Sequence, residues 1–458
     1  MENNYIKYPL YLTATVVAIL LSLNFIPEGI TQKLGMRKID ILSDVRKDTL
    51  TVADKNEPLL FPPPPPPKKD IPCPMGMVCF EDFSADNNGL DNFYKALDKV
   101  KEGKTIRIAF FGDSYIEGDI FSGDLRHFLQ NEFGGSGAGF MPATSQVAGF
   151  RQTVKHNFGG WRSYSILDQN KSYSKMGISG NYFMPDGNAW VKYSGVKRPH
   201  LDVFHQASII YSLPEGKATV SYKINDSKET QTAELPVSAK LTRFDINDSI
   251  REIQLNFSSS NLYLYGVSLQ DKTGVIVDNF SLRGTPGTTL KYLPEDILKQ
   301  TDELLGYDLI ILQYGLNVMS AKQTKYTTYQ KGMEETVNHL KESFPNTSIL
   351  LLSVGDRSMR SADGYSTMPG VPALVSYQQA ICAETGIVFW NLYEAMGGSG
   401  SMVNMVNSRP PRANKDYTHL NFEGGRYLGE ILYNTIMFEK ERYDKLRKNR
   451  RPKKPQNM

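Results

Sequence analysis

Runs of apolar residues separated by amphipathic stretches are the main pattern in the two outer parts of the chain. The run from Thr105 to Phe111 is apolar almost throughout and is followed by Gly112. A run of this kind is typical of a strand that is buried on both faces of a parallel sheet. Further apolar strands are predicted at 308–314, 348–353 and 387–391, with helical patterns at 326–344 and 371–385 between them. The alternation predicts an α/β fold with a doubly wound parallel sheet.

The pattern changes between residues 144 and 275, where short alternating runs replace the helical period. Runs such as 218–224 and 252–257, separated by turn residues, predict an inserted antiparallel β-sandwich. The first strand of the predicted parallel sheet precedes this insert, and the others follow it. Trp161 and Trp190 in the insert could stack on sugar rings, although aromatic side chains also fill small β cores. The insert is therefore a candidate carbohydrate-binding module.

Residues 1–30 are predicted to form a transmembrane anchor or a secretory signal. No charge occurs from Tyr8 to Pro27, and about 20 apolar residues are enough for a helix to span a bilayer. No small-residue cleavage site follows the apolar run, which favours an uncleaved anchor. Lys33, Arg37 and Lys38 follow the span and on their own favour an orientation with the main domain inside the cell. The cysteines and the fold both favour the opposite orientation, and we give them more weight.

A stalk is predicted from residue 31 to residue 79. Its six consecutive prolines, 62–67, form a stiff and extended polyproline II segment. We interpret this segment as a spacer between the membrane and the remaining chain, with a proline-rich ligand for a partner domain as the alternative. Cys73 and Cys79 lack the companions of a standard zinc site. A local disulfide in an oxidising compartment is the favoured interpretation of this pair, and two unreactive thiols are the other.

With 458 residues, of which 40% are hydrophobic and 22% charged, the chain is predicted to be globular and large enough for several domains. Its net charge of +3 is too small to indicate nucleic-acid binding. The positive excess lies mainly at the C-terminus, where a basic tail is predicted at 446–458. This tail is either the solvated end of a helix or a contact for anionic lipid or an anionic envelope polymer. Segments 80–143 and 276–445 are predicted to form the parallel-sheet domain around the insert, 144–275.

A serine, a histidine and an aspartate form the candidate catalytic group. Ser114 follows the first apolar strand, at the place where open α/β sheets carry their chemistry. His419 stands between a loop and a predicted terminal helix, and Asp416 precedes it by three residues. One turn therefore brings the carboxylate to the imidazole. Asn317 and the backbone N–H of Gly287 are candidate donors to an oxyanion, and no metal or cofactor is expected.

Four motifs in order give the chain a resemblance to the SGNH, or GDSL, hydrolase family. They are Gly112-Asp113-Ser114, a Gly-Thr-Thr loop that begins at Gly287, Gly315-Leu316-Asn317, and Asp416-x-x-His419. The resemblance implies that Ser114 is the nucleophile and that His419 and Asp416 complete the triad. It also implies an oxyanion hole made by the Ser114 N–H, Gly287 and Asn317, with Gly284 as the alternative to Gly287.

The chain departs from the family pattern in two places. Gly287 lies 173 positions after Ser114, far more than the family's usual spacing, and the insert accounts for the difference. Val318 follows Asn317 where the family often has aspartate, so the local support of the amide differs from the family's. A domain of this kind, interrupted by a β-sandwich and tethered to a membrane, resembles the peptidoglycan O-acetylesterases of Gram-negative bacteria.

The resemblance implies a serine esterase that removes O-acetyl groups from a cell-envelope glycan, with peptidoglycan as the expected polymer. The expected partners are the O-acylated glycan and, through the N-terminal helix, the membrane. The expected location is the bacterial envelope, with the anchor in the inner membrane and the catalytic domain in the periplasm. An O-acetyltransferase acting on an envelope polysaccharide would use the same triad, and a non-catalytic glycan-binding protein is the alternative that is not an enzyme.

Overall fold

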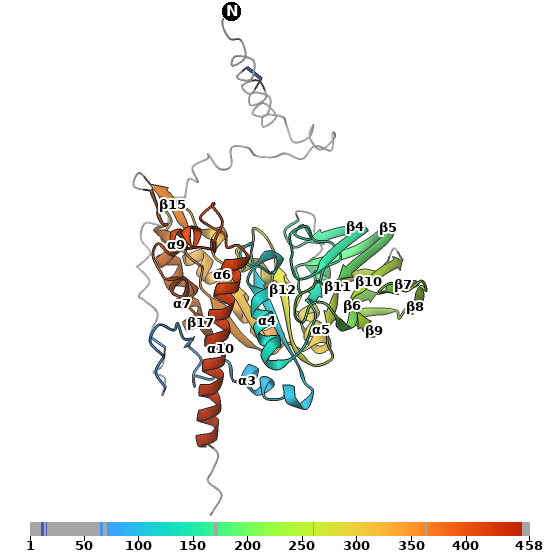
Figure 1. Cartoon of the computed structure of the whole chain (residues 1–458), viewed down its shortest axis with the longest axis horizontal. Helices are drawn as coiled ribbons and strands as arrows, with labels where there is room; N and C mark the ends of the chain where they lie inside the picture. Colours follow the sequence, from blue (N-terminus) through green and yellow to red (C-terminus); the bar gives the residue numbers. More distant parts are fainter. Residues whose placement is uncertain are drawn as a thin grey trace, which may run out of the picture. The chain divides into compact units, whose positions relative to one another are not determined.

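The computed structural model describes residues 71–450 except 169–172, 260 and 362–363, together with residues 11, 12, 15, 65 and 66. The chain forms two units, residues 1–61 and 62–458, and almost all described residues belong to the second (Figure 1). Almost all of the predicted anchor, most of the stalk and the end of the basic tail lie outside the described residues. Within the described part of the chain, no helix is both long enough and apolar enough to cross a membrane.

A six-stranded sheet with the order β1-β17-β14-β13-β2-β12 forms the centre of the second unit. Its strands run parallel, except that β1 at one edge pairs antiparallel with β17. The strands are β1 (Glu81–Asp82), β2 (Thr105–Gly112), β12 (Gly274–Ser281), β13 (Leu309–Gln313), β14 (Ser348–Leu352) and β17 (Val388–Trp390). From Ile106 onward, β2 is buried along its whole length. The predicted α/β fold with a parallel sheet is confirmed.

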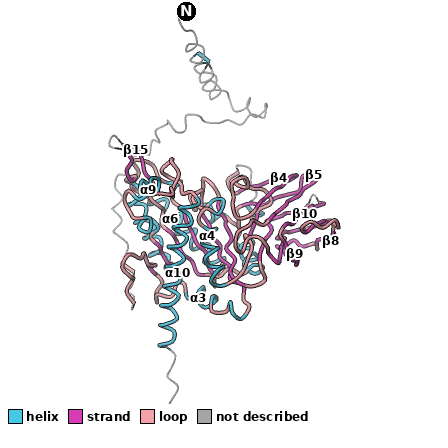
Figure 2. The backbone as a smooth tube through the Cα atoms, viewed as in Figure 1, coloured by secondary structure: helices cyan, strands magenta, loops and turns pink. Residues whose placement is uncertain are grey.

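Helices link these strands and cover the sheet (Figure 2). Helix α4 packs against α10, which also contacts α3, whereas α6 packs against α5 and α7. Because parallel crossovers are right-handed, these two groups cover opposite faces of the sheet. The helices are α3 (Asp91–Leu97), α4 (Ser122–Phe133), α5 (Glu295–Leu305), α6 (Thr327–Ser343), α7 (Gly370–Thr385), α8 (Leu392–Met396), α9 (Ser401–Asn407) and α10 (Phe422–Arg450).

An antiparallel module of nine hydrogen-bonded strands lies between β2 and β12 in the sequence. Alternate side chains of its strands form a hydrophobic core that is separate from the core of the parallel sheet. The strands are β3 (Gly139–Met141), β4 (Lys155–Ser165), β5 (Asn181–Ser194), β6 (Phe204–Leu213), β7 (Ala218–Ile224), β8 (Gln231–Leu235), β9 (Ser238–Ile250), β10 (Glu252–Ser258) and β11 (Tyr263–Gln270). The structure therefore contains the separate antiparallel element that the alternating pattern predicted.

The boundaries of this module differ slightly from the predicted 144–275. Strand β3, which begins at Gly139, already pairs with β11 of the module. Strand β12, which begins at Gly274, pairs along its whole length with β2 in the parallel sheet. The apolar run of β12 follows the module without a helix between them, so periodicity alone does not separate it from the antiparallel strands.

A buried polar network joins the antiparallel module to the parallel sheet. The Nε of Arg107, on β2, donates to Oδ2 of Asp278, on β12, at 2.6 Å. The same guanidinium donates to Gln270 and Ser268 of β11, at 2.8 and 2.7 Å, and Asp278 accepts from the N–H of Phe140 on β3 at 2.7 Å. Burial lowers the pKa of Arg107, but Asp278 and Tyr307 together outweigh burial, so the pKa is raised and the guanidinium stays charged.

The end of the stalk is fixed to the edge of the parallel sheet. Cys73 and Cys79 form a disulfide, and Cys382 is a buried free thiol. The carbonyl of Val78, next to the disulfide, accepts hydrogen bonds from Trp390 Nε1 at 2.9 Å and from Thr435 Oγ1 at 3.1 Å. Residues 73–79 therefore join the domain beside β17 and α10, near the sheet edge formed by β1.

Removing one partner of the buried network should destabilise the domain strongly. Asp278→Ala leaves the Arg107 guanidinium buried without its carboxylate, and such a change typically costs about 3–5 kcal/mol. We expect urea unfolding followed by tryptophan fluorescence to show this loss. Glu295→Ala, which breaks an exposed ion pair with Lys299, serves as the control and should leave the midpoint nearly unchanged. Equal small shifts for both variants would contradict the importance of the network.

Candidate active site

Ser114 lies directly beyond the end of β2, at the point where the order of the parallel strands reverses. Strand β2 has β12 on one side and β13 on the other. The chain runs from β2 toward one edge of the sheet to form β12, and then back past β2 toward the other edge to form β13. Ligands of open α/β sheets bind at such a switch point. A Cβ on Gly112 would come within 2.7 Å of the Ile116 side chain and 3.0 Å of the Gln313 carbonyl. The strand therefore ends in a tight turn that fits glycine.

The side chains of Ser114, His419 and Asp416 form a continuous chain of hydrogen bonds. Ser114 Oγ lies 3.0 Å from His419 Nε2, and His419 Nδ1 lies 2.7 Å from Asp416 Oδ2. The other carboxylate oxygen, Oδ1, accepts from the backbone N–H groups of Thr418 and His419, each at 3.0 Å. The structure thus brings together the three residues that the sequence predicts as a catalytic group.

The turn before α10 keeps the Asp416 carboxylate ionised. Partial burial raises the pKa of Asp416, but the hydrogen bonds from His419 and Thr418 outweigh burial, so the pKa is lowered overall. An ionised Asp416 beside Nδ1 holds the imidazole with its proton on Nδ1 and leaves Nε2 free to accept the serine proton.

Asn317 follows β13, the neighbour of β2, and lines the same groove as Ser114. Its Nδ2 donates to Asp113 Oδ2 at 2.9 Å and to the carbonyl of Thr285 at 3.1 Å. These two acceptors fix the amide in the short helix Leu316–Val318. The amide group therefore lies beside the turn that carries Ser114, although position 318 holds valine where the SGNH family often has aspartate.

Asp113 links the turn that carries Ser114 to Asn317, and the sequence predicts only the first of these two contacts. Its Oδ1 accepts from the backbone N–H of Tyr115 at 2.9 Å, as expected for a carboxylate that supports the serine turn. Its Oδ2 binds Asn317, which lies 204 positions further along the chain, so this contact depends on the sheet topology. Burial raises the pKa of Asp113 to about 6, although the hydrogen bonds from Tyr115 and Asn317 favour its ionised form.

The structure does not support Gly287 as the second backbone donor. The Gly287 N–H donates to Thr285 Oγ1 at 3.2 Å, and a Cβ on Gly287 would lie 2.6 Å from the ring of Tyr314. Gly287 therefore packs into the protein interior. Gly284, the alternative alignment, lines the groove with Ser114 and Asn317 and takes a positive φ of 79°. Of the two glycines, Gly284 is therefore the one that lies at the groove.

The groove has a volume of about 580 Å³ and is open to solvent. Its lining combines the serine and histidine of the catalytic group with two phenylalanines, an ion pair and several amides: Ser114, Glu117, Ile120, Phe150, Arg283, Gly284, Asn317, Asn414, His419, Leu420, Asn421 and Phe422. Trp161 and Trp190 are absent from this lining. Trp161 donates to the carbonyl of Trp190 at 2.9 Å and packs edge-on against Phe257, so it fills the edge of the module core.

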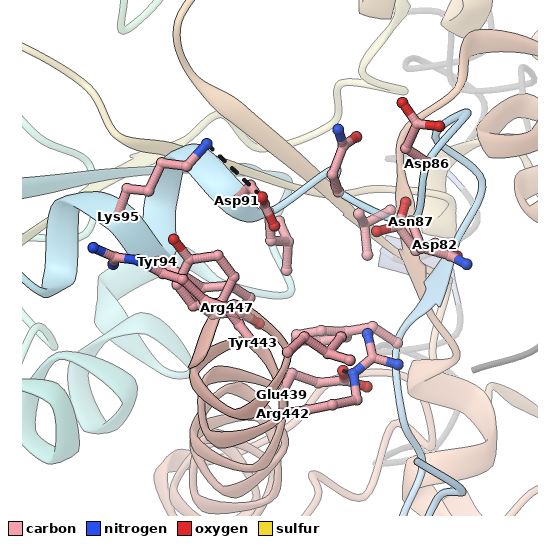
Figure 3. Close-up of a pocket in the computed structure, with 15 residues that line it drawn as sticks. Asp82, Asp86, Asn87, Asp91, Tyr94, Lys95, Glu439, Arg442, Tyr443 and Arg447 are labelled. Atoms are coloured by element: carbon pink, nitrogen blue, oxygen red, sulfur yellow. Dashed lines mark ion pairs between the residues drawn. The ribbon is translucent and has the colours of Figure 1, made fainter. Parts of the chain in front are cut away.

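A second cavity lies where the C-terminal half of α10 meets α3 and β1 (Figure 3). It measures about 230 Å³ and contains no serine, cysteine or histidine among its lining residues. Charged groups around it pair with one another, as in Arg442 with Glu439 at 2.9 Å and Lys95 with Asp91 at 3.8 Å. This cavity lacks the nucleophile and base that the groove at Ser114 provides.

Comparisons with known proteins show the fold. No protein-family model and no curated protein sequence matches the chain. A solved structure of a peptidoglycan O-acetylesterase matches with a TM-score of 0.64 and 20% identity, over 79% of this chain and 99% of that one. A carbohydrate esterase from Cellvibrio japonicus matches with a TM-score of 0.27 and 10% identity, over 63% and 99% of the two chains. A lipase/acylhydrolase from Enterococcus faecalis matches with a TM-score of 0.26 and 18% identity, over 36% and 77%.

The first of these matches includes parts of both the parallel sheet and the antiparallel module, because it covers 79% of this chain. The chain therefore shares the fold of a peptidoglycan O-acetylesterase. The resemblance to SGNH hydrolases that the motifs predict is confirmed at the level of the fold.

The stability of the protein should depend on pH through Asp113. Because its pKa rises from 3.8 to about 6 on folding, its contribution to stability is complete below about pH 4 and is lost as the pH rises through about 6. Asp113→Asn removes this loss of stability, because an amide does not ionise as the pH rises. The variant should therefore gain stability relative to the natural protein between pH 4 and pH 7, by up to about 3 kcal/mol.

Urea unfolding of both proteins at each pH unit from 4 to 8 measures this difference. Comparison at several pH values is necessary because the new amide changes the contact with Asn317 by an amount that does not depend on pH. A stability difference that stays constant across the series would contradict the raised pKa of Asp113.

Proposed function

We propose that the protein is a serine esterase that removes O-acetyl groups from a cell-envelope glycan, with peptidoglycan as the substrate. The observation that carries the proposal is the hydrogen-bonded chain Ser114–His419–Asp416 at the edge of a groove that also holds Asn317. An arrangement of this kind activates a hydroxyl for attack on a carbonyl.

The reaction begins when Ser114 Oγ attacks the carbonyl carbon of the acetyl ester. His419 Nε2 takes the serine proton, and Asp416 stabilises the imidazolium that forms. The negative charge on the carbonyl oxygen is met by the N–H groups of Ser114 and Gly284 and by one N–H of the Asn317 amide, which exchanges its bond to the Thr285 carbonyl for the oxyanion and keeps its bond to Asp113. His419 then gives its proton to the sugar oxygen as the ester C–O bond breaks.

The second half of the reaction clears the acetyl group from the serine. The sugar alcohol leaves, and an acetyl group remains on Ser114 Oγ. His419 removes a proton from a water molecule, whose oxygen attacks the acetyl carbon. Collapse of this second intermediate releases acetate and returns the proton to Ser114. The reaction consumes one water for each ester and requires no cofactor.

The choice of substrate and location rests on two further observations. The structure with a TM-score of 0.64 is named a peptidoglycan O-acetylesterase, and the match covers 79% of this chain. The uncharged segment from Tyr8 to Pro27 and the disulfide Cys73–Cys79 favour attachment to the inner membrane with the catalytic domain in the oxidising periplasm.

The nucleophile and the oxyanion donor can be tested separately with two variants. Ser114→Ala should lower kcat for release of acetate from O-acetylated peptidoglycan by at least about 10³-fold. Asn317→Ala should lower it by about 10²–10³-fold, because one donor to the oxyanion is lost. Ser221 is a half-buried serine on β7 of the module whose hydroxyl bonds to Thr232, so Ser221→Ala is the matched control and should retain normal turnover.

Acetylated xylan and a small acetate ester, assayed in parallel, test the preference for peptidoglycan. We expect the highest kcat/KM on O-acetylated peptidoglycan. Undiminished acetate release by Ser114→Ala would contradict the catalytic assignment, whereas a preference for xylan would contradict only the choice of glycan.

A further inference from the structure

The antiparallel module contributes an aromatic ring to the groove that contains Ser114. Phe150 lies in the loop between β3 and β4, the first two strands of the module. It lines the groove together with Ser114 and His419, and 39% of its surface is exposed. A phenylalanine that remains this exposed at the rim of a groove has an unfavourable contact with water that a ligand could remove.

A buried ion cluster fixes the loop that carries Phe150. Arg151, the next residue, donates to Asp119 Oδ2 through Nη2 at 2.6 Å and through Nε at 3.1 Å. Thr153 donates to the same oxygen, and Arg126 on α4 donates to both carboxylate oxygens. Burial raises the pKa of Asp119, but the two arginines lower it more strongly, so the carboxylate stays ionised.

The position of Asp119 makes this cluster relevant to catalysis. Asp119 ends the short helix Glu117–Asp119, which begins three residues after Ser114. The loop of the module is therefore attached to the same turn that carries the candidate nucleophile. Because buried ion pairs are costly to separate, the cluster holds Phe150 in a defined place relative to Ser114.

The ring of Phe150 also packs directly on backbone of the serine turn. Gly118 takes a positive φ of 62°, and a Cβ at this position would clash with the Phe150 ring. The absence of a side chain at Gly118 lets the ring lie against the main chain. The ring thus contacts the main chain at Gly118 and belongs to a loop that the ion cluster holds in place, and part of it lines the groove.

The rest of the groove combines polar and apolar groups near this ring. Arg283 forms a bidentate ion pair with Glu117 at 2.9 and 2.5 Å, and both residues line the groove. A sugar ring has the matching character, because its C–H groups form an apolar face and its hydroxyls lie around the edge. The negative face of an aromatic ring attracts such C–H groups.

We propose that Phe150 is a stacking platform that positions the sugar ring whose acetyl ester reacts at Ser114. This inference rests on the proposed function and specifies how the glycan is recognised. It makes the antiparallel module part of the active site through its first loop. The glycan contact is thereby assigned to Phe150, and Trp161 and Trp190 keep a role in the packing of the module.

The test compares a glycan ester with a small ester that has neither a sugar nor an aromatic ring. The substrates are O-acetylated peptidoglycan and glycerol triacetate, and the readout is the ratio of their kcat/KM values. Phe150→Leu keeps an apolar side chain but removes the ring, and should lower this ratio about three- to tenfold, mainly by raising KM for the glycan. Phe150→Trp should keep the ratio near that of the natural protein.

Tyr292→Ala is the matched control, because Tyr292 is an aromatic residue that is 51% exposed and lies outside the lining of the groove. This variant should leave the ratio unchanged. Thermal unfolding of each variant should show the same midpoint for Phe150→Leu as for the natural protein. A lower ratio without a change in midpoint would support stacking.

Two results would overturn the inference. The first is an unchanged ratio for Phe150→Leu in a protein that releases acetate from the glycan. The second is a lowered ratio for Phe150→Trp as well, since that would indicate a purely steric effect. Failure of the proposed function has a different signature: the natural protein would hydrolyse neither substrate faster than Ser114→Ala does.

Discussion

The buried carboxylate of Asp113 connects the two strand ends on which the candidate active site depends. One of its oxygens accepts from the Tyr115 N–H and closes the serine turn, and the other accepts from the Asn317 amide beyond the neighbouring strand. Burial of this charge is unfavourable, as the raised pKa of about 6 shows. The two hydrogen bonds offset only part of this cost, and they set the positions of the nucleophile turn and the oxyanion donor relative to each other. Strained or costly groups of this type are common at functional sites.

Two further buried ion clusters attach the antiparallel module to the segment that carries Ser114. Arg107, near the start of β2, binds Asp278 and two side chains of β11, and Asp119, after the serine turn, binds Arg151 in the first loop of the module. The module therefore contacts the catalytic segment before and after the nucleophile. This double attachment explains how an insert of this length leaves the parallel sheet intact: β3 and β12, at its two ends, lie beside each other, and domains inserted between neighbouring chain ends are well tolerated.

The sequence predicts the local features of this molecule better than its long-range contacts. Apolar runs identify β2, β13, β14 and β17, and the motifs identify Ser114, Asp416, His419 and Asn317 as residues that converge. The loop that begins at Arg283 has no periodic pattern that would show which of its glycines lies at the site. Only the contacts in the structure distinguish Gly284, which lines the groove, from Gly287, whose N–H is bonded to Thr285. Phe150 and Asp119 carry no motif, because their importance arises from contacts with residues of other elements. The anchor at residues 1–30 lies almost wholly outside the described part of the chain and stays a prediction.

The account depends most directly on Ser114 being an activated nucleophile, and covalent labelling tests this point. The purified protein would be treated with a serine-directed fluorophosphonate, digested, and analysed by peptide mass spectrometry. We expect one adduct, on the peptide that contains Ser114, and a much slower reaction in His419→Ala, because Nε2 lies 3.0 Å from the serine oxygen and serves as its base. An adduct on a different serine, or acetate release that continues undiminished after Ser114 is modified, would contradict the account.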